Sequence, residues 1–246
     1  MAAVLAASAS SAAFAADVDL AKLDEITKRF PFAIELGAPG AKDHRFIYAD
    51  YRTHIHVYRE KDGALDLDWE STNLGSRVTS MFVADLYADG KDKLVVSTAA
   101  GRILIYDLDD YDLVWENLQD RFERVQYMVA GNLDADAQGE LVFIANGVLY
   151  IYDSLNKNIE WQSQTTFDAR QILIANVDDD EQMEIILNTG VILDSRFYTI
   201  ELQADSAFGD RISLFDLNGD GTPEIIGEYG DFNLKVFDIY AEREIW

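Results

Sequence analysis

The sequence predicts an all-β fold, a β-propeller of about five four-stranded blades, and three observations support this prediction. Trp69, Trp115 and Trp161 are spaced 46 residues apart, and Trp246 follows 85 residues later. Short segments rich in β-branched and aromatic residues recur between Gly, Asn and Asp, four to each repeat. An acidic loop also recurs at one place in successive repeats. Tandem four-stranded units of this length are typical of propeller blades, whereas the competing β-sandwich requires no such period.

Each repeat supplies four strand-like segments in chain order. The first is "SMFVADL", "YMVAGNL", "ILIANV" or "SLFDL", and the second is "KLVVST", "ELVFIAN", "MEIILNTG" or "PEIIGEYG". The third is "GRILIYD", "GVLYIYD" or "NLKVFD", and the fourth carries the tryptophan, except that the fourth unit has "RFYTIEL" there. The first unit has "PFAIELG", "RFIYADY", "HIHVYRE" and "LDLDWES". The predicted blades are residues 31–77, 78–126, 127–169, 170–210 and 211–246.

The tryptophans fall on the outermost predicted strand of their units. A large ring at this position can cover the face of the next blade, and its recurrence favours blade-to-blade packing. Stacking against carbohydrate is the alternative explanation.

The N-terminal segment differs in composition from the rest of the chain. Residues 1–16 are small and apolar, and Ala13, Phe14 and Ala15 form an A-x-A pattern before the sequence turns acidic. We expect residues 1–16 to be a signal or leader segment and residues 17–30 a lead-in to the propeller. The alternative is a disordered Ala/Ser leader, because a basic n-region is missing. Export predicts a secreted, periplasmic or cell-surface protein.

Charge and composition narrow the classes of partner. The chain has 45 Asp and Glu against 20 Lys and Arg, a formal net charge of -25. This charge repels phosphate backbones and anionic lipid, so we expect no nucleic-acid partner. No run approaches the roughly 20 apolar residues of a membrane span. Without cysteine, neither a disulfide nor a thiolate metal site is possible.

The fifth unit contains the most complete acidic loop, "DLNGDGTPEI". Asp216, Asn218, Asp220 and Glu224 occupy its positions 1, 3, 5 and 9, with Gly221 at position 6. Calcium takes six to eight oxygen ligands in flexible geometry, and such a loop can direct several oxygens to one point. Magnesium fits less well because it demands strict octahedral geometry. The alternative is that these residues only form Asx-turns.

Three other units carry variants of this loop. The third and fourth units also predict calcium sites, although Ala137 and Glu181 replace the glycine. In the second unit Tyr87 and Lys93 occupy positions 3 and 9, so the Lys93 ammonium could substitute for the ion. The predicted ligands in the third and fourth units are Asn132, Asp134, Asp136, Glu140, Asn176, Asp178, Asp180 and Glu184.

Tandem "DLNGDGTPEI"-type loops followed by strands such as "GVLYIYD" resemble the FG-GAP/VCBS repeats of integrin-like β-propellers. The resemblance covers residues 78–246 well and 31–77 poorly. It implies a calcium-stabilised propeller, and it is less specific for function, because such repeats occur in adhesion proteins, lectins and accessory domains of secreted enzymes. Strands that end in tryptophan, such as "LYIYDSLNKNIEW", are also similar to the quinoprotein-like propeller repeat.

Motifs for catalysis are not apparent. The sequence has no G-x-S-x-G, Walker loop or HExxH, and nothing marks which carboxylates would act as acid and base. His44, His54 and His56 all lie in the first unit, and we expect a partly exposed strand pair rather than a metal site. We therefore predict an exported module that binds a protein or glycan partner. The alternative is a catalytic or accessory domain of a secreted polysaccharide-degrading enzyme.

Four arginines precede the innermost strands of successive units. In a propeller these entry loops meet at one mouth of the channel, so the arginines could form an anion or acidic-glycan site. The alternative is that each pairs with a nearby carboxylate such as Asp120, Asp168 or Asp210. The arginines are Arg77, Arg124, Arg170 and Arg211.

Overall fold

The computed structural model describes residues 32–37, 43–61, 64–118, 121–134, 136–178, 180, 182–230 and 233–246. The predicted leader, residues 1–16, and lead-in, residues 17–30, lie outside these ranges, as do Asp120 and Glu181. Within the described ranges the regular elements are all strands, and none is a helix long and apolar enough to cross a membrane. Contacts divide the chain into two compact units, Met1–Arg77 and Val78–Trp246.

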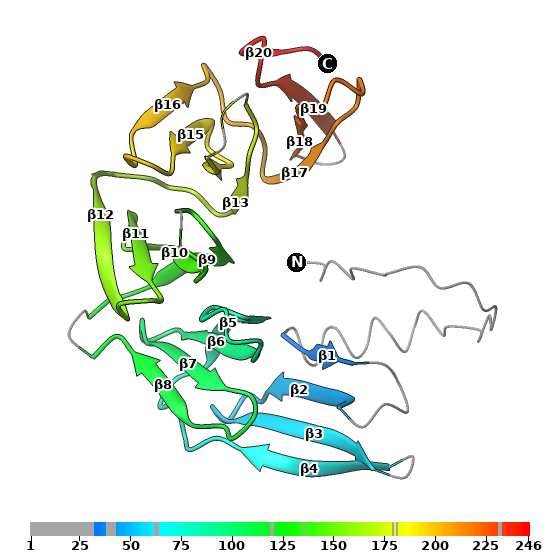
Figure 1. The fold of residues 1–246 in the computed structure, drawn as a ribbon, viewed down its shortest axis with the longest axis vertical. Helices are drawn as coiled ribbons and strands as arrows, with labels where there is room; N and C mark the ends of the chain where they lie inside the picture. The colour runs from blue at the N-terminus through cyan, green and yellow to red at the C-terminus, as the bar shows by residue number, and fades with distance from the viewer. Residues whose placement is uncertain are drawn as a thin grey trace, which may run out of the picture. The chain divides into compact units, whose positions relative to one another are not determined.

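The first unit contains one antiparallel sheet whose four strands pair in chain order (Figure 1). Ile47, Ile55 and Val57 are fully buried, because they share the inward side of the two central strands. The strands are β1 (Ile34–Leu36), β2 (Arg45–Ala49), β3 (Ile55–Lys61) and β4 (Ala64–Glu70).

The second unit contains four further sheets of four antiparallel strands, again paired in chain order. The second sheet comprises β5 (Val78–Ala84), β6 (Lys93–Thr98), β7 (Ile103–Asp107) and β8 (Leu113–Glu116). The third comprises β9 (Val125–Gly131), β10 (Glu140–Ala145), β11 (Val148–Asp153) and β12 (Asn158–Thr166). The fourth comprises β13 (Ile172–Ala175), β14 (Glu184–Leu187), β15 (Val191–Asp194) and β16 (Ile200–Gln203). The fifth comprises β17 (Arg211–Phe215), β18 (Glu224–Tyr229), β19 (Asn233–Asp238) and β20 (Arg243–Glu244).

The second strands of the second, third and fourth sheets are buried along their whole length, so both of their faces are covered. Leu141 and Phe143 of β10 join a buried cluster with the second sheet, whereas Val142 and Ile144 join one with the fourth sheet. Since side chains alternate along a strand, β10 packs against neighbours on both sides. Burial of each such side chain contributes about 1.5–3 kcal/mol. Successive sheets of the second unit therefore share cores.

Tryptophans on the outer strands pack across two of the interfaces between successive sheets. The ring of Trp115 in β8 lies 4.4 Å from that of Tyr152 in the third sheet, centroid to centroid. In the same way Trp161 in β12 lies 4.9 Å from Tyr198, which belongs to the fourth sheet's β15–β16 turn. Both indoles therefore pack on the next sheet. Trp246 follows β20 and is 70 % exposed.

Candidate metal-binding loops

The four acidic loops occupy equivalent places in the second unit. Each joins the first strand of a sheet to the second, and its last residue begins that second strand. This closing residue is almost fully buried in every case. The loops are 85–93, 132–140, 176–184 and 216–224, and their closing residues are Lys93, Glu140, Glu184 and Glu224.

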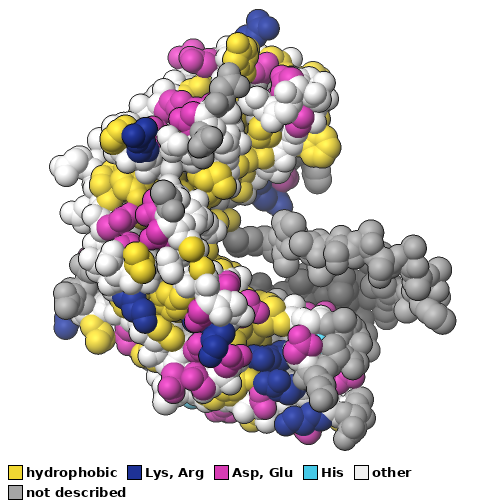
Figure 2. Space-filling model, viewed as in Figure 1, with side chains coloured by type: hydrophobic (Ala, Val, Ile, Leu, Met, Phe, Trp, Pro, Cys, Tyr) yellow, Lys and Arg dark blue, Asp and Glu magenta, His cyan; other side chains and the backbone are white. Residues whose placement is uncertain are grey.

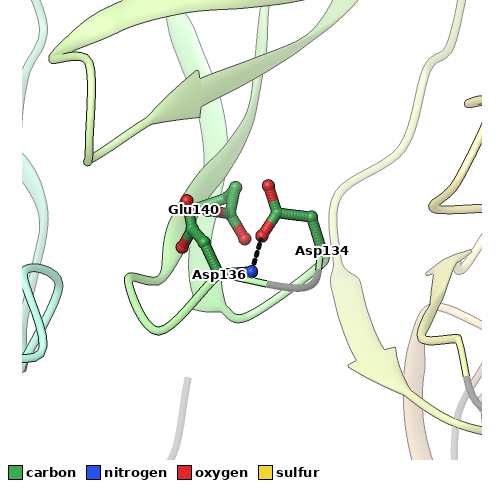
Figure 3. Close-up of side chains that lie close together, drawn as sticks. All are labelled: Asp134, Asp136 and Glu140. Carbon is green, nitrogen blue, oxygen red and sulfur yellow. Dashed lines mark hydrogen bonds between the residues drawn. The ribbon is translucent and has the colours of Figure 1, made fainter.

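Loop 132–140 brings three carboxylates together, as Figure 3 shows. Asp134, Asp136 and Glu140 each offer an oxygen, and these oxygens all lie within 4.8 Å of one another. The Asp136 backbone N–H donates to Asp134 Oδ1 at 2.8 Å, which sets the turn. Leu133 N–H donates to Glu140 Oε2 at 2.6 Å, whereas buried Oε1 has no hydrogen-bond partner among the described residues. The carboxylate of Glu140 thus keeps one buried acceptor oxygen without a donor among the described residues.

The electrostatics of this cluster favour a cation. Burial raises the pKa of Glu140 to about 7, and the charges of Asp134 and Asp136 act in the same direction against the Leu133 hydrogen bond. A hard divalent cation would supply the opposite charge that these oxygens lack. The residues present therefore fit a metal ion.

Loop 176–184 repeats the arrangement. Oxygens of Asp178, Asp180 and Glu184 lie within 4.8 Å of one another, and Val177 N–H donates to Glu184 Oε2 at 2.7 Å. Burial raises the pKa of Glu184 to about 7, and the charge of Asp178 adds to this effect. Two acidic clusters of the second unit could thus each hold a metal ion.

The asparagines predicted as ligands in these two loops make hydrogen bonds through their amide nitrogens, and coordination of a metal by their oxygens stays a prediction. Asn132 Nδ2 donates to the Asp136 carbonyl oxygen at 2.8 Å, and Asn176 Nδ2 donates to the Asp180 carbonyl oxygen at 2.5 Å. Each side-chain amide therefore bridges the loop and holds positions 1 and 5 together.

A further carboxylate that the sequence analysis missed lies beside loop 176–184. Burial and a hydrogen bond with Asp178 raise the pKa of Glu201, in β16, to about 7. Both side chains line a cavity of about 410 Å³, together with Asp180 and with Tyr240 and Glu242 of the fifth sheet. No local motif indicates this neighbour, because Glu201 approaches the loop only through the fold of the sheet.

Loop 216–224 has the best-matching sequence, yet its side chains are arranged differently. Asp216 accepts hydrogen bonds from Gly219 N–H at 2.6 Å and Gly221 N–H at 3.0 Å. Asn218 Nδ2 donates to Glu224 Oε1 at 2.8 Å, and Leu217 N–H donates to Oε2 at 2.7 Å. These side chains bond within the loop, and its acids do not form a converging group like the two above. Calcium binding here stays a prediction.

The contacts of the described residues do not bring the four arginines of the predicted anion site together. Arg211 Nε pairs with Glu228 at 3.2 Å, on the neighbouring strand. Arg124 and Arg170 are exposed and form no ion pair with a described residue. Arg77 belongs to the first unit. An anion site therefore stays a prediction.

The histidines of the first unit have carboxylate neighbours that the sequence analysis did not identify. His44 Nε2 lies 2.8 Å from Glu35 Oε1 and its Nδ1 lies 2.5 Å from Glu60 Oε2, and these hydrogen bonds raise the pKa of His44. His56 Nε2 lies 3.2 Å from Asp50 Oδ2. Strand pairing creates these contacts, which local spacing does not reveal.

Comparison with known proteins identifies the fold. No protein-family model matches the chain, and no curated protein matches its sequence. Among solved structures, Sqt1 of Saccharomyces cerevisiae is similar with a TM-score of 0.58 and 14% identity. The biofilm matrix protein Bap1 of V. cholerae is similar with a TM-score of 0.56 and 18% identity, and BamB of Moraxella catarrhalis with 0.51 and 14%.

These matches cover most of the chain but only part of the neighbours. They include 82%, 83% and 82% of this chain, and 57%, 34% and 57% of Sqt1, Bap1 and BamB respectively. At such identities the likeness concerns the fold alone. Together with the five four-stranded sheets it confirms the predicted β-propeller.

Proposed function

We propose that the protein is a calcium-stabilised β-propeller that serves as a binding module for a protein partner. The observation that carries the calcium assignment is buried Glu140, whose carboxylate lies beside Asp134 and Asp136 and whose Oε1 has no donor among the described residues. A buried acceptor without a partner costs free energy, and a bound cation would remove this cost.

Calcium suits these loops better than other common metals. The clusters offer carboxylate oxygens, and hard oxygen donors select calcium or magnesium over zinc or copper. Loops of varied sequence adapt to the flexible coordination of calcium more readily than to the strict octahedron of magnesium.

The loop position supports a propeller of the FG-GAP/VCBS type. Each acidic loop joins the first and second strands of its sheet, and each closing residue begins the second strand. A cation held there would tie two strands of a sheet together. It would also offset the repulsion among neighbouring carboxylates.

The scaffold and the surface support a binding role. The Bap1 neighbour is a biofilm matrix protein, which supports a module that works by attachment. Acidic side chains spread over the face shown in Figure 2, in keeping with the net charge of -25. We propose an exported location, secreted, periplasmic or at the cell surface, where millimolar calcium keeps even modest sites filled. The partner would be neutral or basic, since long-range repulsion disfavours an acidic one.

Calcium dependence is tested by unfolding the protein in calcium and in EGTA, with bound metal counted by mass spectrometry. At free calcium of 100 times the Kd, each filled site should add about 2.7 kcal/mol to the free energy of unfolding. Glu140→Gln and Glu184→Gln should each remove one ion and most of its stabilisation. Glu123→Gln, which changes an exposed carboxylate away from the loops, is the matched control.

The outcomes separate the parts of the proposal. A wild-type protein that binds no calcium, or keeps its calcium response in the double variant, contradicts the cation assignment. Protein and glycan arrays probed in calcium, beside a hydrolysis assay on the same sugars, test the binding role. Binding to a protein without sugar turnover supports the module, and turnover abolished by one carboxylate substitution supports an enzyme instead.

A further inference from the structure

We propose that the Lys93 ammonium is a built-in cation that closes loop 85–93 in place of a metal ion. The second sheet would then hold its loop in any buffer, whereas the third and fourth sheets depend on an external ion. Only this contrast rests on the proposed function, because the contacts of Lys93 stand by themselves.

The ammonium group sits among oxygen atoms. Lys93 Nζ lies 3.1 and 3.3 Å from the two carboxylate oxygens of Asp89 and 2.8 Å from the Lys91 carbonyl oxygen. Asp107 Oδ2, from the neighbouring strand β7, lies 3.5 Å away. The Lys93 side chain is only 2 % exposed. A buried ammonium requires such compensation, so this oxygen shell is what allows a lysine here.

Position 3 of the loop is adapted to the same cation. Tyr87 stands where the other loops have Asp or Asn, and its ring lies 5.4 Å from Lys93 Nζ. A second ammonium, Lys157 Nζ of the third sheet, lies 4.8 Å from the same ring. The face of an aromatic ring attracts cations. The junction of the second and third sheets thus uses two lysine charges that belong to the chain.

The Asp89 carboxylate of this loop has a cation in place. Burial acts to raise the pKa of Asp89, but hydrogen bonds from Lys93 and Lys91 N–H and their charges hold it below its ordinary value. The pKa of Glu140, in the equivalent acidic loop, is raised instead. The two loops therefore differ in whether the positive charge is supplied by the chain.

Substitution of Lys93 by glutamate should convert loop 85–93 from a loop closed by a lysine into a loop that binds a metal ion. A glutamate is one bond shorter than a lysine, and a calcium–oxygen distance of about 2.4 Å would return the positive charge to a similar place. The carboxylate introduced by Lys93→Glu could also accept a hydrogen bond from Leu86 N–H, as Glu140 does from Leu133. Asp89, Asp107 and the Lys91 carbonyl would remain as further oxygen donors.

The test compares Lys93→Met, Lys93→Glu and the control Lys61→Met in the full chain. Lys61 pairs with Asp68 at the surface, outside loop 85–93, and is half exposed. Amide hydrogen exchange of residues 85–98 is measured in EGTA and in calcium, with bound calcium counted. Lys93→Met should exchange at least about tenfold faster in both buffers, because the carboxylates of Asp89 and Asp107 lose their buried cationic partner. Lys93→Glu should exchange fast in EGTA, recover in calcium and bind one calcium more than the wild type.

Each result supports or overturns the inference. Lys93→Met exchanging like the wild type and Lys61→Met overturns it, whatever the wild-type calcium content. Fast exchange in Lys93→Met supports it even if the wild-type protein binds no calcium and the proposed function fails. If the wild type does bind calcium but Lys93→Glu gains no ion, the equivalence of ammonium and metal is overturned.

Discussion

The four loops of the second unit differ in pairs at their first position. Loops 85–93 and 216–224 begin with aspartate, Asp85 or Asp216, and are here named the Asp-first loops. Loops 132–140 and 176–184 begin with asparagine and are the Asn-first loops. In the Asp-first loops the leading carboxylate accepts hydrogen bonds from loop N–H groups, at 3.2 and 3.0 Å for Asp85. In the Asn-first loops the leading amide donates to the carbonyl at position 5 instead.

Position 6 follows the same division. Gly90 and Gly221 of the Asp-first loops have φ of 75° and 98°, which turn their N–H groups toward the leading carboxylate. Ala137 of an Asn-first loop lacks a positive φ. Only glycine adopts this conformation without strain. Positions 1 and 6 thus act together and stabilise the Asp-first loops from within, whereas the proposed cation would stabilise the Asn-first loops.

The largest difference between the Asp-first and Asn-first loops is expected in how the free energy of unfolding depends on pH. Glu140 and Glu184 have a pKa of about 7 when folded, against 4.5 ordinarily. A raised pKa stabilises the folded protein below about pH 4.5, and this contribution is lost as pH rises through about 7. In EGTA the free energy of unfolding should therefore fall between these limits, as urea titrations would measure. The fall should shrink in the Glu140→Gln, Glu184→Gln double variant, and equal slopes in both proteins would contradict this prediction.

A smaller effect is expected from the glycine of an Asp-first loop. Gly221→Ala should cost about 1–2 kcal/mol of unfolding free energy, because an L-residue is strained at this φ. No atom lies within 4 Å of the added Cβ, so a steric clash does not contribute. Ala137→Gly, the matched change in an Asn-first loop, should cost only about 0.5 kcal/mol. Equal costs in thermal unfolding would mean that position 6 does not distinguish the loop types.

The smallest effect is expected from an exchange at position 1. Asn132→Asp removes the hydrogen bond to the Asp136 carbonyl and should cost about 0.5–1.5 kcal/mol in EGTA. Adding Ala137→Gly should recover part of this loss, because the glycine can direct its N–H to the new carboxylate. A double-mutant cycle measures this coupling. Strictly additive effects would show that positions 1 and 6 act independently, which would contradict this prediction.

The fold and the loop positions were accessible from the sequence, but the state of each loop was not. The tryptophan period and the four-strand units predicted the propeller, which the structure confirms. The spacing of oxygen-bearing residues also located all four loops between the first and second strands. The spacing did not reveal how the side chains of each loop are arranged. In loop 216–224, which has the complete motif, Asp216 accepts hydrogen bonds from backbone N–H groups of the same loop.

The features that the sequence did not reveal depend on contacts between residues of different strands and sheets. Glu201 reaches Asp178 from β16, and Lys157 reaches the Tyr87 ring from the next sheet. These partners are far apart in the chain, so no local pattern contains them. The orphan oxygen of Glu140 is likewise a property of burial rather than of spacing.

The paired aromatic rings at the sheet junctions make tryptophan fluorescence a probe of the contacts between sheets. Trp115 and Trp161 each lie within about 5 Å of a tyrosine from the following sheet, close enough for excitation energy to pass between the rings. Emission from Trp115 would register parting of the second and third sheets, and that from Trp161 parting of the third and fourth. Trp246, open to water, would add a steady background.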